Sequence, residues 1–160
     1  MVIALMLGCG LRIIEVPALE VSDIDLERSR LHVRCSKRKK DRSIPIGKGV
    51  LSRLKTHFEY WNPTKFVFEC LTCSGIPISI ASINRVLKEA VKAASIAKNV
   101  SAHSLRHSYA MLLVESHVPL PVVQEYMGHS DIKTTMVYLK LVSIPAQKIV
   151  TPVDQLFNVR

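Results

Sequence analysis

The sequence predicts a mainly α-helical domain with one small antiparallel β-sheet, an α+β fold. Apolar residues recur at helical spacing in several segments, and glycine, proline or capping residues bound most of them. Two short segments alternate apolar and polar residues on either side of a polar turn, as the strands of a hairpin do. The chain has 160 residues, of which 48% are hydrophobic, and this suits a single domain with a substantial core.

The N-terminal segments are predicted to be helical. Residues 1–7 are apolar from the first position and have no capping residue, so we expect them to be the end of a helix whose beginning is missing. On this interpretation the chain is a fragment of a longer protein. Helical spacing resumes over residues 12–19, where Pro17 is tolerated if it lies in the first turns of the helix.

The predicted sheet follows. Residues 31–33 and 43–46 alternate apolar and polar side chains, and a strongly basic, polar stretch at residues 36–41 separates them. This pattern predicts a β-hairpin with a basic tip, and residues 24–26 are a candidate third strand.

The remainder of the chain is predicted to be helical, except for a loop over residues 61–78 that contains prolines and a glycine. A proline opens the helix of residues 119–127, which should end at Gly128, and Ser130 or Asp131 should cap the next helix. Helices are predicted over residues 50–60, 79–97, 103–116, 119–127 and 131–138.

The charge balance favours a polyanionic partner. Lysine and arginine number 22 against 13 aspartates and glutamates, which gives a net charge of +9 and a pI near 9.6. Nucleic acid is the commonest partner of so basic a protein, although a soluble protein can be basic without binding one.

Several other classes of protein are disfavoured. Residues 1–7 are too short to span a bilayer and lack the features of a secretory signal. The four cysteines show no disulfide pattern, so a reducing cytoplasm is expected. Cys70 and Cys73 are half of a zinc-binding pattern without a second pair, and we expect two incidental thiols and no metal site.

Two groups of residues near the C-terminal end are candidates for phosphoryl chemistry. His103 and Arg106 are three residues apart, which places them on one face of a helix, where the guanidinium can bind two phosphate oxygens and the imidazole can move a proton. A helix start with a surface arginine is the alternative. His107 is expected to point elsewhere. His129 lies in a predicted turn, and Tyr138 is a candidate nucleophile only if cations and a base surround it.

Two further groups lie near the N-terminal end. Arg12 and Glu15 are three residues apart and can pair on a helix face, either as an ordinary ion pair or as a carboxylate that fixes a functional guanidinium. The basic residues between Lys37 and Arg42 are either a solvated turn or a set of phosphate contacts with one lysine placed to protonate a leaving oxygen.

Taken together, these residues resemble the tyrosine recombinase, or phage integrase, family, which includes Xer and Cre-like recombinases and the integrases of integrons and phages. The matching blocks occur in the family's order over nearly the whole chain from Cys9 to Leu141. They are G-L-R-I-I-E at 10–15, V-S-D-I-D at 21–25, K-R-K-K-D-R-S-I-P-I at 37–46, H-S-L-R-H-S-Y-A at 103–110 and V-Q-E-Y-M-G-H-S-D-I-K-T-T-M-V-Y at 123–138.

The resemblance implies the fold of a tyrosine recombinase catalytic domain over residues 1–160, truncated at its start and without the N-terminal domain that clamps DNA. It implies a cytoplasmic enzyme, associated with the bacterial nucleoid, that cuts and rejoins double-stranded DNA. A tyrosine attacks a phosphodiester, forms a 3′-phosphotyrosyl link and frees a 5′-hydroxyl, without a metal or other cofactor.

The resemblance also implies residue roles. Tyr138 is the expected nucleophile, Arg12 and Arg106 clamp the phosphate, His103 helps to take the tyrosine proton, and His129 hydrogen-bonds the phosphate. Lys37, or alternatively Lys39, protonates the 5′-oxygen. Glu15 orients Arg12. The remaining basic residues of the hairpin are expected to contact the DNA backbone, and they are Arg38, Lys39, Lys40 and Arg42.

The sequence leaves alternatives for the C-terminal tail, the oligomeric state and the function. Beyond Leu141 the helical pattern weakens, with a candidate helix at residues 153–157, and residues 142–160 resemble a tail that docks on a neighbouring subunit. Full-length family members act as tetramers on DNA, whereas this fragment is expected as a monomer or a tail-exchanged dimer. A catalytically inactive DNA-binding remnant of a mobile-element integrase and a DNA-relaxing enzyme of the topoisomerase IB type are the alternative functions.

Overall fold

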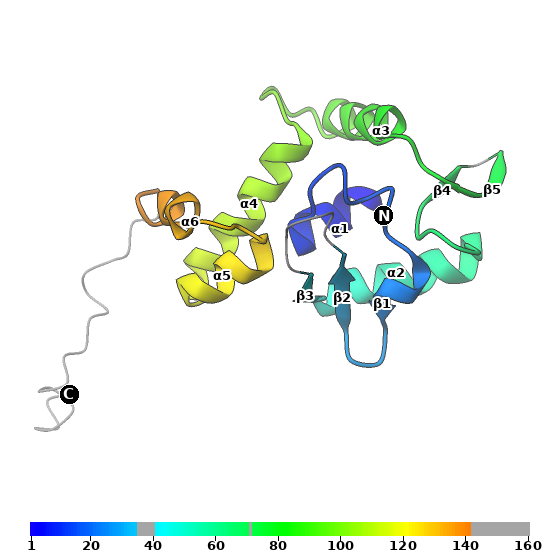
Figure 1. The fold of residues 1–160 in the computed structure, drawn as a ribbon. Helices are drawn as coiled ribbons and strands as arrows, with labels where there is room; N and C mark the ends of the chain where they lie inside the picture. The colour runs from blue at the N-terminus through cyan, green and yellow to red at the C-terminus, as the bar shows by residue number, and fades with distance from the viewer. Residues whose placement is uncertain (35–40, 71, 142–160) are drawn as a thin grey trace, which may run out of the picture.

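A computed structural model describes residues 1–34, 41–70 and 72–141, which form six α-helices, a short 3-10 helix and two small antiparallel sheets. This architecture confirms the predicted α+β fold class (Figure 1). In chain order the elements are α1 (Val2–Cys9), η1 (Val21–Asp23), β1 (Ile24–Asp25), β2 (Arg30–Val33), β3 (Arg42–Pro45), α2 (Lys48–Trp61), β4 (Glu69–Cys70), β5 (Cys73–Pro77), α3 (Ile80–Ala93), α4 (Ala102–Glu115), α5 (Leu120–Met127) and α6 (Ile132–Leu139).

The predicted hairpin and its third strand are confirmed by the three-stranded sheet β1-β2-β3. Leu31 in β2 lies opposite both Ile24 in β1 and Ile44 in β3. The alternation in the sequence corresponds to alternating burial, since Leu31, Val33 and Ile44 are buried while His32 is exposed. One face of the sheet therefore belongs to the core.

Helix α1 packs against α4 at the centre of the molecule, and α4, α5 and α6 form a group on one side of it (Figure 1). Gly10 ends α1 in a left-handed conformation, with φ of 61°. A Cβ atom at Gly10 would lie 2.2 Å from Cδ1 of Tyr109 in α4. The close approach of these two helices therefore requires a glycine at the end of α1.

The segment of residues 12–19 is not the predicted helix but a succession of turns. Leu11, Val16 and Leu19 are buried, so the apolar residues that suggested a helix do face the core. The backbone N–H of Arg12 is hydrogen-bonded to the Glu15 side chain at 2.7 Å, and Pro17 has no N–H to donate. Local side-chain bonding and the proline thus replace the helical ladder.

The predicted loop over residues 61–78 contains the hairpin β4-β5. Its organiser is the Glu69 carboxylate, which accepts hydrogen bonds from the backbone N–H groups of Thr64, Lys65, Phe66 and Gly75. These bonds lower the pKa of Glu69 to about 2, with the bonds from Gly75 and Lys65 contributing most. Such a clamp leaves no periodic signal in the sequence, which is why the hairpin was not predicted.

The boundaries of the last two helices agree with the prediction. α5 ends at Gly128, whose φ is 59°, and Asp131 caps α6 by accepting a hydrogen bond from the Lys133 backbone N–H. The helix predicted over residues 79–97 ends earlier, at Ala93. Of its predicted apolar face, Ile83 and Leu87 are buried.

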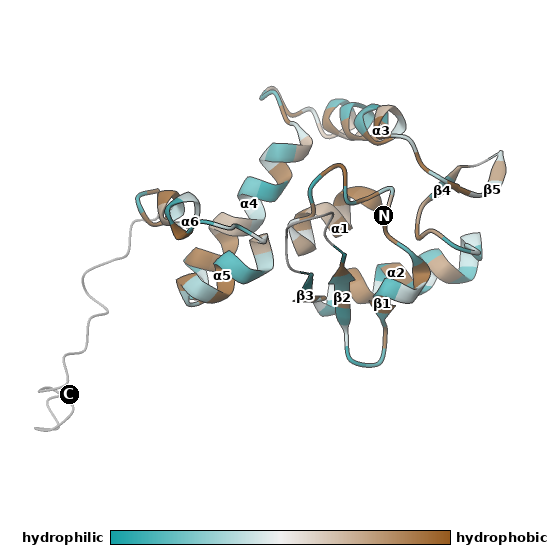
Figure 2. Ribbon diagram, in the orientation of Figure 1, coloured by the Kyte–Doolittle hydropathy of each residue, from teal (hydrophilic) through white to brown (hydrophobic). Residues whose placement is uncertain are grey.

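Hydrophobic and hydrophilic residues alternate along the helices, as the colours of the ribbon show (Figure 2). Beside the hairpin β4-β5 and α3, a cavity of about 880 Å³ is lined by Trp61, Phe68, Ile76 and Val86 among others. No helix in the described ranges is long and apolar enough to cross a membrane.

Candidate active site

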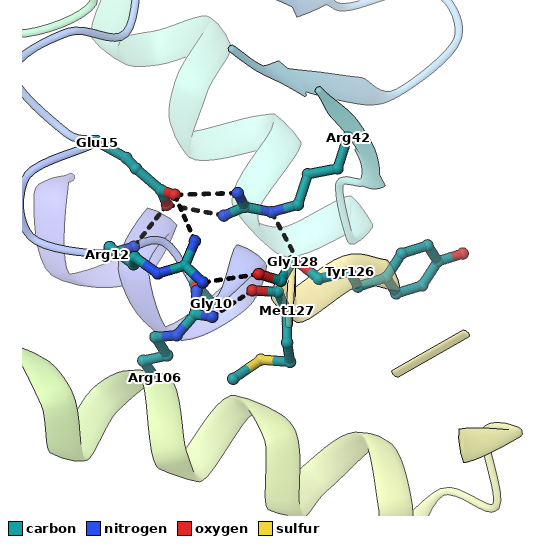
Figure 3. A network of polar contacts seen from close by, with 8 residues as sticks. All are labelled: Gly10, Arg12, Glu15, Arg42, Arg106, Tyr126, Met127 and Gly128. Carbon is teal, nitrogen blue, oxygen red and sulfur yellow. Dashed lines mark hydrogen bonds and ion pairs between the residues drawn. The ribbon is translucent and has the colours of Figure 1, made fainter. Parts of the chain in front are cut away.

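Arg106 lies at the centre of the candidate site. Its side chain projects from α4 and is buried, with 6% of the residue exposed. One Nη atom donates to the carbonyl of Gly10 and the other to the carbonyl of Met127, as Figure 3 shows. These carbonyls end α1 and α5, where the helix dipoles concentrate negative charge. Arg106 thus joins the C-terminal ends of two helices that are far apart in the sequence.

The burial of Arg106 does not remove its charge at neutral pH. Burial, followed by the nearby Arg12 charge, lowers the pKa of its guanidinium to about 10, while Glu15 acts in the opposite direction. The side chain is therefore still protonated near pH 7. A cation held in a poorly solvated position is well suited to bind an anion.

Arg12 lies on the turn that follows α1 and, like Arg106, binds the end of α5. Its Nη2 donates to the carbonyl of Gly128 at 2.8 Å, and its Nη1 to Oε1 of Glu15 at 2.9 Å. The predicted pairing of Arg12 with Glu15 is present, although on a turn and not on a helix face. In the hydrogen bonds of the described residues, Arg12 and Arg106 each use two of the five guanidinium donors. Both side chains therefore keep donors for an anion.

Glu15 is shared between two arginines. Besides Arg12, it accepts two parallel bonds from Arg42, with Nη1–Oε1 at 2.9 Å and Nη2–Oε2 at 2.7 Å (Figure 3). Burial by itself would raise the pKa of Glu15, but the hydrogen bonds and charges of Arg42, followed by those of Arg12, lower it below its ordinary value. The carboxylate is therefore ionised at neutral pH.

The position of Arg42 differs from the exposed basic tip that the sequence suggested. Its side chain is only 2% exposed, and its Nε donates to the carbonyl of Tyr126 at 2.9 Å. The expected contact with the DNA backbone does not fit a side chain turned into the protein. The sequence could not indicate this, because the partners lie 27 and 84 residues away.

His129 follows the left-handed turn at Gly128. Its Nδ1 lies 2.9 Å from Oγ1 of Thr135, which is fully buried in α6, and its carbonyl accepts a hydrogen bond from the Gln124 side chain. These contacts fix both the ring and the backbone of His129. The role of Thr135 was not foreseen, although its place six residues after His129 brings the two together across the turn.

Tyr138 lies in α6 and is buried, with 7% of the residue exposed. Its ring packs on that of His107, with ring centroids 5.0 Å apart and the planes tilted by 50°. His107, which was expected to point away from His103 and Arg106, thus lies against the candidate nucleophile. Burial raises the pKa of Tyr138, and the charge of Arg106 opposes this effect. The phenol is accordingly neutral near pH 7.

The remaining candidate residues are His103 and the basic residues at positions 37–40. His103 is exposed in the first turn of α4, one turn before Arg106. Residues 37–40, which include Lys37, Arg38, Lys39 and Lys40, lie outside the described residues. Within the described part of the chain, no three His, Cys, Asp or Glu side chains are grouped so that they could hold a metal ion.

The site is thus a group of three arginines, Arg12, Arg42 and Arg106, that gathers around Glu15 and the ends of α1 and α5, next to the turn that carries His129. The model of the phage integrase family matches residues 1–143. The chain belongs to the phage integrase family.

Two curated relatives illustrate the similarity. The chain is 41% identical over 137 residues to a tyrosine recombinase of Thermosipho africanus, covering 86% of the chain and 47% of that protein. It is 33% identical over 144 residues to the tyrosine recombinase XerA of Pyrococcus furiosus, covering 88% of the chain and 49% of that protein. The chain therefore spans about half the length of the curated relatives it matches.

Solved structures agree on the fold. A crystal structure of XerA recombinase superposes with a TM-score of 0.80 at 23% identity, covering 99% of this chain and 57% of that one. The catalytic domain of bacteriophage HP1 integrase gives a TM-score of 0.64 at 22% identity, covering 99% of this chain and 80% of that one. At these identities the likeness concerns the fold, which is that of a tyrosine recombinase catalytic domain.

Proposed function

We propose that this chain carries the strand-cutting and rejoining site of a site-specific DNA recombinase that works through a 3′-phosphotyrosyl intermediate at Tyr138. The observation that carries the proposal is the meeting of Arg12 and Arg106 at the end of α5, with Tyr138 near enough to be influenced by the charge of Arg106. The two guanidinium groups come from separate segments and lie around the same helix ends, and the charge of Arg106 acts on Tyr138. Family membership and the net charge of +9 support double-stranded DNA as the substrate.

The chemistry is a transesterification. The Tyr138 oxygen bonds to phosphorus as the bond from phosphorus to the 5′-oxygen breaks, so no external energy source is needed. The phenolic proton passes to a base, for which His103 is the candidate, and the leaving 5′-oxygen takes a proton from Lys37 or Lys39. A 5′-hydroxyl of a second strand then reverses these steps.

The protein's main contribution is charge stabilisation. In the reaction negative charge accumulates on the non-bridging oxygens of the phosphate, and Arg12 and Arg106 have donors to place on them. His129 supplies a further hydrogen bond. Each group is positioned before DNA arrives, since Glu15, Thr135 and the helix-end carbonyls already hold these side chains. Preorganised donors of this kind lower the barrier because they need not reorient during the reaction.

The proposed assembly follows the family. Double-stranded DNA is the partner, with a tetramer on DNA for the full-length protein and a monomer or tail-exchanged dimer for this chain. The proposed tail, residues 142–160, lies outside the described residues. Two related structures, those of the Tn1549 transposon integrase with a circular intermediate DNA and of XerH with its difH substrate, are complexes with DNA.

The test is covalent capture of DNA. A pool of duplexes with a randomised central sequence is nicked near each candidate cleavage site, so that cleavage releases a short fragment and traps the protein. We expect a protein–DNA species on a denaturing gel that is absent with Tyr138→Phe and retained with Tyr60→Phe, a matched change at a 77% exposed tyrosine. Binding of the pool without any covalent species would favour the inactive remnant.

A second assay with the same protein distinguishes DNA relaxation from recombination. If supercoiled plasmid is relaxed through Tyr138 but no strand is exchanged between captured duplexes, the topoisomerase-like alternative is favoured over recombination.

A further inference from the structure

Arg42 has a role that the proposed reaction does not assign. It begins β3, directly after the basic segment, yet its side chain is almost completely buried. All three nitrogen atoms of its guanidinium donate: two to the Glu15 carboxylate and one to the carbonyl of Tyr126. A guanidinium used in this way serves as a connection inside the protein, not as a surface charge.

Arg42 connects three separate segments. Through Glu15 it reaches the turn that carries Arg12, and through Tyr126 it reaches the end of α5 (Figure 3). It also lies against Gly128, where an added Cβ would come within 3.1 Å of its Cδ and Nη1 atoms. The turn that presents His129 is therefore packed directly on this side chain.

We infer that Arg42 is a positioning residue that acts through Glu15 and the Gly128 turn to hold Arg12 and His129 in their phosphate-binding places, without touching DNA itself. This inference rests on the proposed function, since it concerns the same site. The planar fork of arginine matches a carboxylate with two parallel bonds, which a lysine cannot reproduce.

The bonds from Arg42 explain how Glu15 can orient Arg12 without cancelling the positive charge of the site. A lone carboxylate would form a single ion pair with Arg12 and neutralise it. With Arg42 bound on both oxygens, the group of Arg12, Glu15 and Arg42 keeps a net positive charge of one, and Arg106 adds a second nearby. The carboxylate therefore orients Arg12 while the site as a whole still attracts an anion.

The first arm of the test measures the contact without any catalysis. The Glu15 carboxyl is followed by ¹³C NMR during a pH titration, with Glu15→Gln identifying its signal. The charged groups that face it are Arg12 on its own turn, Arg42 from β3 and Arg106 from α4. We expect Arg42→Met to raise the pKa of Glu15 and to shift the ring signals of His129. Arg28→Met, which removes an exposed arginine of the β1–β2 turn, should change neither.

The second arm measures the consequence. On a duplex selected from the capture pool, Arg42→Met should slow covalent complex formation at saturating DNA by about 100-fold, the scale expected for a misplaced reacting group. The dissociation constant should rise by far less than about 100-fold, and the slope of log K against log salt should change by much less than about 1, because Arg42 itself contacts no phosphate. Loss of a phosphate contact would instead reduce that slope by about 1.

The outcomes separate the two proposals. A wild type that captures no DNA contradicts the proposed function, and the NMR arm still decides whether Arg42 holds Glu15 and His129. Unchanged Glu15 and His129 signals in Arg42→Met, or a lower salt slope with a normal cleavage rate, would overturn the inference. Thermal unfolding is measured for every variant. If Arg42→Met and Arg42→Lys both fail to fold, Arg42 is needed for stability and the positioning role is abandoned.

Discussion

Several residues of this site form hydrogen bonds with partners that are far away in the sequence. Arg106 bonds to carbonyls 96 and 21 residues distant, and Arg42 to groups 27 and 84 residues distant. Side chains that looked like ordinary surface cations in the sequence are therefore buried connections. Their burial costs solvation, which hydrogen bonds to carboxylate and carbonyl oxygens offset.

Thr135 illustrates a residue whose importance depends on one contact. Thr135→Val keeps the shape but removes the hydroxyl that bonds to His129 Nδ1, so the ring loses one of the contacts that orient it. We expect covalent complex formation to slow by about 10-fold to 100-fold, the usual effect of losing a group that orients a functional side chain. Thr134→Val, at the neighbouring exposed position, is the control and should retain the wild-type rate.

The identity of the general acid can be tested at the level of single atoms. If the 5′-bridging oxygen of the DNA is replaced by sulfur, the leaving thiol has a pKa of about 8.5 and departs without a proton. Substituting alanine for the lysine that acts as the acid, Lys37 or Lys39, should slow cleavage of ordinary DNA by about 10²-fold to 10⁴-fold. The sulfur substrate should restore the cleavage rate of that variant. Arg12→Ala should not be restored, and restoration of neither lysine variant would exclude both as the acid.

At the scale of elements, the site is built from helix ends. α1 ends at Gly10 and α5 at Gly128, and the carbonyls of these ends receive Arg106 and Arg12. The helices could be predicted from the spacing of apolar residues and from the prolines and glycines at their ends. The turn at residues 12–19 and the hairpin β4-β5 could not be predicted in this way. In both segments a carboxylate that binds backbone N–H groups sets the local conformation, and it does so without a periodic pattern of apolar residues.

Gly128→Ala tests one of these ends. The left-handed φ of 59° is unfavourable for alanine by about 1–2 kcal/mol, and the new methyl would press on Arg42. We expect a lower free energy of unfolding in urea together with slower DNA cleavage. Gly49→Ala, in the first turn of α2 with nothing within 4 Å of the added Cβ, should leave both unchanged or stabilise the protein slightly. Equal effects of the two substitutions would contradict a specific role for the Gly128 turn.

For the whole molecule, the core contains groups that resist ionisation. Cys9 is fully buried, and burial raises the pKa of its thiol from 9.0 to about 12. Burial also raises the pKa values of Tyr109 and Tyr138 above their ordinary values. Above pH 9 the unfolded chain loses these protons while the folded protein retains them, so the free energy of unfolding falls as pH rises.

The contribution of Cys9 to this alkaline loss is measurable. Between pH 8 and pH 10.5, the free energy of unfolding in urea should fall by about 2 kcal/mol more in the wild type than in Cys9→Ala. Cys73→Ala removes an exposed thiol and should show the wild-type dependence. The same pH dependence in all three proteins would mean that Cys9 titrates normally in the folded state.

The sequence by itself determined the α+β class, most helix boundaries and the family, because apolar periodicity, capping residues and ordered motifs are local properties of the chain. It also identified Arg12, Glu15, Arg106, His129 and Tyr138 as candidates. Only the tertiary structure decided that Arg42 is buried on Glu15, that Thr135 holds His129 and that His107 packs on Tyr138. Those contacts join residues from different elements, and their geometry depends on how the helix ends meet, which no local pattern records.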